Sequence, residues 1–153
     1  MHNRAYRRLL VILFSLSITG CMQDTQQTIV NSHAEVLLTK NNELQFRFKI
    51  NEKILNEEQA YKVKVSIHNL KLASALGTDE IVYGADTNYD GEYIEVKNNK
   101  DNYIFMTPIP MVKDLHVFEI EDMIVKEDAV SVEVFNDKEV IAKAFLTNFS
   151  SQF

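Results

Sequence analysis

The sequence predicts an all-β domain, an antiparallel sandwich of two sheets with seven to nine strands and one short helix. Apolar and polar residues alternate along residues 44–50, 61–67 and 130–134, which is the pattern of strands with one buried face. Similar stretches recur along the chain and are joined by short polar turns. This spacing is typical of a two-sheet sandwich.

The first twenty residues have the layout of a secretory signal. Arg4, Arg7 and Arg8 precede an apolar run over residues 9–18. This run is too short for a membrane span, because about 20 apolar residues are needed to cross a bilayer. A charged start and a short apolar core predict a signal peptide over residues 1–20.

The four residues that end the signal resemble the lipobox of bacterial lipoproteins: Ile18, Thr19, Gly20 and Cys21. The resemblance implies that the Cys21 sulfur takes a diacylglycerol, that the chain is cut before Cys21, and that the new amino terminus is then acylated. The alternatives are a short buried helix or an uncleaved anchor in which the cysteine is incidental.

Removal of residues 1–20 leaves 133 residues, enough for one domain with its own core. The net charge falls from -6 to -9, because three arginines and no acid are lost. Such a surface repels nucleic acid and anionic lipid headgroups, so we expect no nucleic-acid partner and membrane attachment through acyl chains alone. Cys21 is the one cysteine of the chain, so we expect no disulfide.

The polar residues 21–33 predict an acylated flexible tether, and residues 34–153 predict the sandwich. The turn at 136–139 and residues 140–146 predict a hairpin with the strand before them. Pro108 and Pro110 mark an edge of a sheet or a corner between strands.

Residues 70–76, closed by Gly77, predict the short helix, and residues 122–128 fit either a helix or a loop. Weaker strand candidates are 34–39, 81–83, 92–96, 103–107 and 115–120. A sandwich of this strand number would be immunoglobulin-like or transthyretin-like.

A calcium loop is one interpretation of the middle of the chain. Asp86, Asn88 and Asp90 precede Gly91 at the spacing of oxygen ligands in such a loop. The twelfth position, which should supply a glutamate, is Lys97. The alternative is a turn rich in Asn, Asp and Gly, which needs no ion.

The sequence supports copper binding and catalysis less than it supports a calcium loop. Histidine and methionine could hold reduced copper, but no tight pair of either residue occurs, and core packing explains the methionines. The chain has no nucleophile elbow, phosphate-binding glycine loop or metalloprotease motif, so we expect no enzyme. The copper candidates are His33, His68, His116, Met106 and Met111.

Residues 44–76 resemble the opening of TssJ-type lipoproteins, the outer-membrane anchors of type VI secretion systems. The matching residues are Leu55, Asn56, Val63, Val65, Ile67, Leu70 and Lys71. The resemblance implies a β-sandwich without a catalytic site that docks onto the periplasmic part of an inner-membrane protein. The chain departs from the family pattern at His68 and Asn69, where the family has tyrosine and glutamine.

Candidate docking residues lie within and after this stretch. The resemblance implies a docking region around Asn69, Leu70 and Lys71, and tyrosines such as Tyr83 and Tyr89 have the amphipathic character that interfaces favour. These tyrosines would equally serve strand packing.

We therefore expect a non-enzymatic lipoprotein at the periplasmic face of the outer membrane, which anchors an envelope or secretion complex. Met22, in place of an aspartate, fits sorting to that membrane. A cell with one membrane would place the protein on its outer face instead. The alternative function is an envelope lipoprotein that binds a metal or a small ligand.

Overall fold

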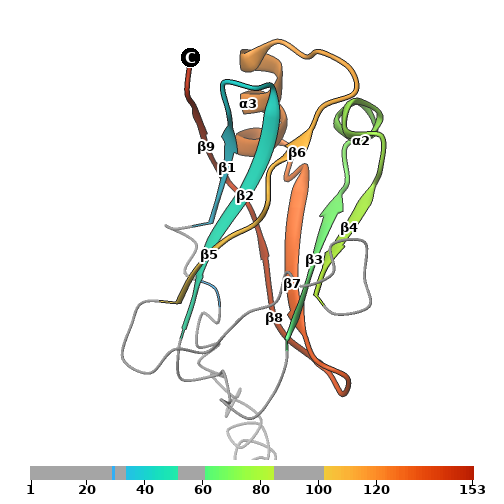
Figure 1. Ribbon diagram of the computed structural model, residues 1–153, viewed down its shortest axis with the longest axis vertical. Helices are drawn as coiled ribbons and strands as arrows, with labels where there is room; N and C mark the ends of the chain where they lie inside the picture. The colour runs from blue at the N-terminus through green and yellow to red at the C-terminus, as the bar shows by residue number, and fades with distance from the viewer. Residues whose placement is uncertain (1–28, 30–33, 52–60, 85–101) are drawn as a thin grey trace, which may run out of the picture.

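The computed structural model describes residues 29, 34–51, 61–84 and 102–153, which form two facing β-sheets with two helices at one end (Figure 1). The first sheet has the order β5-β2-β1-β9, and β6 also pairs with β2; the second has the order β4-β3-β7-β8. The strands of the first sheet are β1 (Glu35–Leu38), β2 (Glu43–Ile50), β5 (Asn102–Phe105), β6 (Ile109–Pro110) and β9 (Asn148–Ser151). Those of the second are β3 (Lys62–Ile67), β4 (Glu80–Tyr83), β7 (Val130–Phe135) and β8 (Val140–Phe145).

The core lies between the two sheets and is built by the alternation seen in the sequence. On β2, every second residue from Leu44 to Ile50 is buried, and the residues between them are partly exposed. On β3 and β7 the inward residues are mostly valines, whose branched side chains suit a pleated surface. The two-sheet architecture and its nine described strands therefore agree with the sequence-based prediction.

One pairing departs from the antiparallel prediction. β9, a strand that the sequence does not reveal, runs parallel to β1, with Glu35 opposite Asn148 and Leu38 opposite Ser151. Only two residues, Leu146 and Thr147, separate β8 from β9, so the chain passes from one sheet directly to the other. The last segment thereby joins the edges of both sheets.

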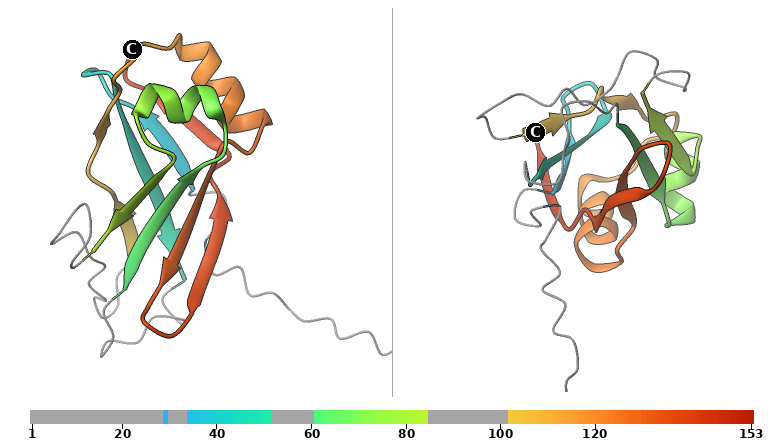
Figure 2. Two further views of the ribbon diagram at one scale, coloured as in Figure 1. Left: turned by 90° about the vertical axis from the view of Figure 1, so that its right-hand side faces the viewer. Right: turned by 90° about the horizontal axis from the view of Figure 1, so that it is seen from below.

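Two helices cover one end of the sandwich, as the two views in Figure 2 show. α2 (Leu70–Leu76) agrees with the predicted helix and ends at Gly77, whose φ of 76° is the left-handed conformation that glycine favours. α3 (Val117–Lys126) overturns the predicted strand at 115–120. Its buried residues Ile120, Met123 and Ile124 follow helical spacing, and this pattern extends through the segment that the sequence left ambiguous.

The chain enters the sandwich at the opposite end from the helices. Ile29 forms an isolated antiparallel bridge with Ile50, the last residue of β2. The turn from β1 into β2 lies at the end that carries the helices (Figure 1), where the Asn42 side chain donates to the Asp114 carboxylate at 2.7 Å and the Met111 N–H donates to the Asn42 carbonyl oxygen at 3.1 Å. The amino-terminal entry point and the helices are thus separated by the full length of β2.

Candidate functional site

Several residues singled out in the sequence lie outside the described residues. They are the predicted lipidation site Cys21, the calcium candidates Asp86, Asn88 and Asp90, the tyrosine Tyr89, the copper candidate His33, and the strand expected at 92–96. The docking candidates Asn69, Leu70 and Lys71 lie at the start of α2. We define the helical end as α2, α3 and residues 111–116; the three docking candidates that the structure describes at this end begin α2 or directly precede it.

Asn69 fixes the start of α2 against the end of α3. Its side-chain oxygen accepts hydrogen bonds from the backbone N–H groups of Lys71 at 2.9 Å and Leu72 at 3.1 Å. Its side-chain nitrogen donates to the Glu127 carboxylate at 2.7 Å. Capping of this kind stabilises a helix by about 1 kcal/mol. Asn69 is thus a structural residue that holds its neighbour Leu70 in place.

A second link joins the two helices. The Lys71 ammonium lies 2.9 Å from the Glu119 carboxylate. The hydrogen bond from Lys71, followed by one from the His116 backbone N–H, lowers the pKa of Glu119. Both side chains are about half exposed, so this ion pair contributes little to stability. The pair is a surface contact between α2 and α3.

His116 begins α3 as part of a capping box. The backbone N–H of Phe118 donates to His116 Nδ1 at 3.4 Å, and the His116 N–H donates to the Glu119 carboxylate at 3.4 Å. The rings of His116 and Phe118 stack with centroids 5.2 Å apart. This arrangement holds the Phe118 ring at the surface, where 67% of the residue is exposed.

Tyr83 does not belong to this surface. It is fully buried in β4, and its hydroxyl donates to the Thr107 carbonyl oxygen at 3.1 Å. The inward side of an edge strand takes a tyrosine when its polar tip finds a hydrogen-bond partner. Tyr83 is therefore a core residue, and its ring is not available to a partner.

The structure brings together one serine and one histidine that are far apart in the sequence. His68 Nε2 lies 2.8 Å from Ser131 Oγ, and the His68 ring packs against Phe145 at 5.7 Å. A nucleophilic serine must reach its substrate, but only 1% of Ser131 is exposed. The geometry favours a structural hydrogen bond that satisfies a buried hydroxyl.

We expect a serine-directed fluorophosphonate probe to leave Ser131 unlabelled, because the neighbouring side chains cover the hydroxyl and the reagent cannot reach it. We expect Ser131→Ala to cost about 1 kcal/mol, since the exposed His68 regains a hydrogen bond from water. Peptide mass spectrometry checks the first result and urea unfolding the second. A probe adduct on Ser131 of the folded protein would contradict this structural role.

The copper candidates within the described residues serve separate structural purposes. His68 binds Ser131, His116 caps α3, Met106 is buried, and Met111 packs against the core. Among residues 29, 34–51, 61–84 and 102–153, no group of three or more histidine or carboxylate side chains is placed to hold a metal ion.

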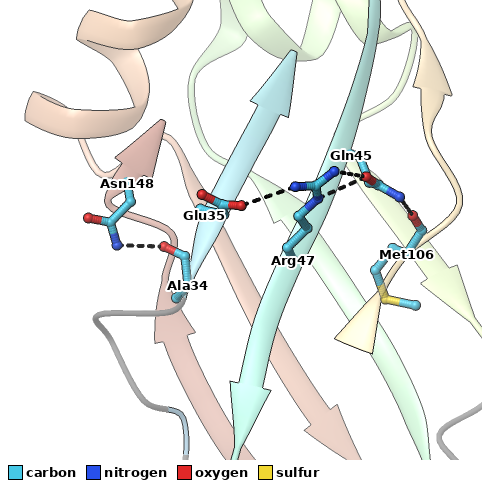
Figure 3. Close-up of polar contacts among 6 residues, drawn as sticks. All are labelled: Ala34, Glu35, Gln45, Arg47, Met106 and Asn148. Atoms are coloured by element: carbon cyan, nitrogen blue, oxygen red, sulfur yellow. Dashed lines mark hydrogen bonds and ion pairs between the residues drawn. The ribbon is translucent and has the colours of Figure 1, made fainter. Parts of the chain in front are cut away.

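The outer face of the first sheet carries a row of polar contacts, drawn in Figure 3. Arg47 lies 3.3 Å from the Glu35 carboxylate and donates two hydrogen bonds to the Gln45 side-chain oxygen, at 2.9 and 2.7 Å. Gln45 in turn donates to the Met106 carbonyl oxygen at 2.9 Å. These contacts connect β1, β2 and the segment after β5. Asn148 adds a bond from β9 to the Ala34 carbonyl oxygen at 3.0 Å.

The outer face of the second sheet carries a different contact, centred on Glu133 of β7. Its carboxylate lies 2.6 Å from Lys143 on β8 and 2.6 Å from Lys64 on β3. Hydrogen bonds from Lys143 and Lys64 lower the pKa of Glu133. A carboxylate with a lowered pKa in the folded state stabilises the protein above its unfolded pKa, about 4.3, and this stabilisation is lost as the pH falls.

We therefore expect Glu133→Gln to lower the melting temperature by about 3–6 °C at pH 7. The difference from the unmodified protein should shrink steadily as the pH falls from about 4.3, the unfolded pKa, through the lower folded-state pKa of Glu133, below which both proteins carry an uncharged side chain at this position. Thermal unfolding followed by circular dichroism across this range measures the effect. Glu139→Gln, at an exposed glutamate of the same hairpin, is the control and should be nearly neutral. A difference that stays constant with pH would contradict the assignment.

Neither helix of the described part of the chain has the length and hydrophobicity needed to cross a bilayer. Comparison of the chain with protein-family models, with curated proteins and with solved structures finds no match.

Proposed function

We propose that the protein is a lipid-anchored, non-enzymatic β-sandwich that serves as the structural anchor of an envelope or secretion complex. The observation that carries this proposal is the position of Ile29, which bridges Ile50 at the end of the sandwich opposite α2 and α3. An acylated Cys21 would hold that end near the membrane. The helical end would then face the aqueous space, where other envelope proteins are reached.

Chain length sets the distance between the membrane and the domain. Ile29 follows Cys21 by eight positions, and an extended chain spans at most about 29 Å over that length. β2 alone adds about 24 Å from Ile50 to Glu43, since a strand rises about 3.4 Å per residue. The helical end would thus reach up to roughly 53 Å from the lipid surface. This geometry suits a protein that presents a docking surface to a distant partner.

The type VI-like form of the proposal is supported by the sequence resemblance over residues 44–76. A short helix, α2, directly follows β3, as that resemblance implies. The finer fold assignment, an immunoglobulin-like or transthyretin-like sandwich, is proposed on the basis of two facing sheets and of connections, such as that from β8 to β9, that run from one sheet to the other. We propose the periplasmic face of the outer membrane as the location, or the outer face of the membrane in a cell that has only one.

Mild crosslinking in intact cells, followed by purification of the protein from detergent-solubilised membranes, tests the proposal. We expect an envelope protein to co-purify in a defined ratio. Recovery of the protein alone under crosslinking conditions would count against an anchoring function.

The alternative function is binding of a metal or small ligand near the membrane, with Asp86, Asn88 and Asp90 as calcium ligands. A ligand that binds the folded form raises its melting temperature by mass action. Thermal unfolding with calcium, copper and zinc therefore distinguishes the two functions. A rise with one ion that is abolished by Asp86→Asn and Asp90→Asn together would favour the alternative.

A further inference from the structure

We propose that the helical end binds a basic segment of a partner protein in which lysine or arginine lies next to a large apolar residue, with Leu70 and Phe118 as the anchoring side chains. This inference rests on the proposed function, because it names the chemistry of the partner that the anchored domain would hold.

Leu70 and Phe118 are large apolar residues left in water. Leu70 is 87% exposed at the first position of α2, and Phe118 is 67% exposed near the start of α3. The neighbouring residues Leu72 and Ile120 on the same helices are fully buried, so each helix already has a core-facing side. Val112, in the segment before α3, adds a third apolar residue that is 68% exposed. Apolar residues gathered at one end of a domain are typical of a contact surface.

The ring of Phe118 and the backbone that carries Leu70 are held in place before a partner arrives. Leu70 lies between Asn69, which is bonded to Glu127, and Lys71, which is bonded to Glu119. Phe118 directly precedes Glu119 and stacks on His116. The ion pair at 2.9 Å thus joins the residues that directly follow Leu70 and Phe118. A ring and a backbone segment ordered in advance lose less conformational entropy on binding.

The charge of the helical end indicates the chemistry of the partner. The helical end contains four carboxylates and three lysines, and the residues that directly flank it add four more carboxylates and no lysine, which gives eight carboxylates and three lysines over residues 68–80 and 111–129. Two of these lysines are paired with carboxylates, in the Lys71–Glu119 and Lys126–Asp122 ion pairs. Glu121 lies three residues after Phe118 and four before Val125, so it shares one face of α3 with these two apolar residues. An acidic surface with apolar residues at its margins is complementary to a basic segment with an apolar side chain.

Two other occupants fit this surface less well. A second copy of the chain would set two acidic surfaces against each other, which is unfavourable. An anionic membrane would be repelled by the same charge, and the helical end lies opposite the entry point at Ile29. A basic protein segment is therefore the occupant that the charge and the geometry favour.

Site-specific photo-crosslinking in intact cells tests this proposal on the full lipidated chain. Benzoylphenylalanine is incorporated singly at positions 70 and 118, and at positions 105 and 140 as controls, because Phe105 and Val140 are exposed apolar residues of strands away from the helices. We expect positions 70 and 118 to crosslink to one partner peptide that is rich in lysine or arginine. Glu121→Lys should reduce this crosslink at least about tenfold. Glu139→Lys makes the same charge change at the opposite end and should leave the crosslink unchanged.

The remaining outcomes overturn the proposal in distinguishable ways. Crosslinks from positions 70 and 118 to an acidic or uncharged peptide, to lipid, or to a second copy of the chain would show that the partner chemistry is wrong. Crosslinks from positions 105 or 140 alone would move the docking surface elsewhere and leave the anchoring function standing. If none of the four positions gave a crosslink, both the docking surface at the helical end and the anchoring function would be contradicted.

Discussion

Replacement of Cys21 by serine is expected to abolish the incorporation of radiolabelled palmitate into the protein. A serine hydroxyl does not replace the thiolate, which is the nucleophile in cysteine chemistry. The lipobox resemblance implies that the chain is cut before residue 21 only after the Cys21 sulfur has been acylated. Residues 1–20 should therefore stay attached to the variant. Each buried methylene of an acyl chain contributes about 0.8 kcal/mol to membrane binding, and two or more chains make it stable. The loss of the lipid therefore removes the attachment that the proposed function requires.

Gln27→Ser provides the matched control, since it changes a polar residue of the predicted tether to the same amino acid. This variant should incorporate palmitate as the unmodified protein does. If Cys21→Ser still carried the label, or lost residues 1–20 normally, the lipid-anchored location would be wrong.

Phe46→Ala should cost about 3–5 kcal/mol of folding free energy, because a large cavity opens where the two sheets meet. Phe46 is fully buried in the middle of β2, opposite Val36 of β1. A domain of this size is stable by about 5–15 kcal/mol, so the change removes a large share of the total. The melting temperature should fall by more than about 10 °C, as measured by thermal unfolding of the purified protein in detergent.

Phe105→Ala is the matched control for Phe46→Ala, because it removes the same ring from the neighbouring strand β5. Phe105 is 58% exposed and lies on the outer face, stacked with Tyr103 and beneath Arg47. Its loss should cost about 1 kcal/mol or less. Equal effects of the two variants would contradict the assignment of the core to the space between the sheets.

The parts of the fold that the sequence predicts correctly are those fixed by local pattern. Strands β2 and β3 show clear alternation over residues 44–50 and 61–67, and β7 and β8 flank a turn rich in polar residues. The helix α2 is followed by a glycine that ends it in the left-handed conformation. Each of these signals lies within a few residues of the element that it predicts, so no long-range contact is needed to find it.

The error at 115–120 has a local cause. Leu115, Val117 and the apolar residues around them suggest a strand when read over six residues. The helical spacing becomes visible only when the window extends to Met123 and Ile124. His116 also caps α3 through its ring nitrogen, and histidine is not among the preferred capping residues. A longer window would have favoured a helix.

Other features depend on contacts that no local pattern contains. β9 has no alternation, and it is a strand because it pairs with β1, more than a hundred residues earlier. His68 and Ser131 meet only because β3 pairs with β7. The candidate site also combines local and long-range signals. The sequence resemblance indicates Asn69, Leu70 and Lys71. Phe118 comes near them only because the fold brings α3 to α2, where Glu119 pairs with Lys71. Tyr83 was a docking candidate by residue type, and its burial is decided by the fold.

The mass of the protein extracted from membranes with detergent tests the lipid anchor most directly. The account predicts an amino-terminal peptide that begins at Cys21 and carries a diacylglycerol on its sulfur together with an acyl chain on its amine. A Cys21 with a free thiol, or a peptide that still contains residues 1–20, would contradict it.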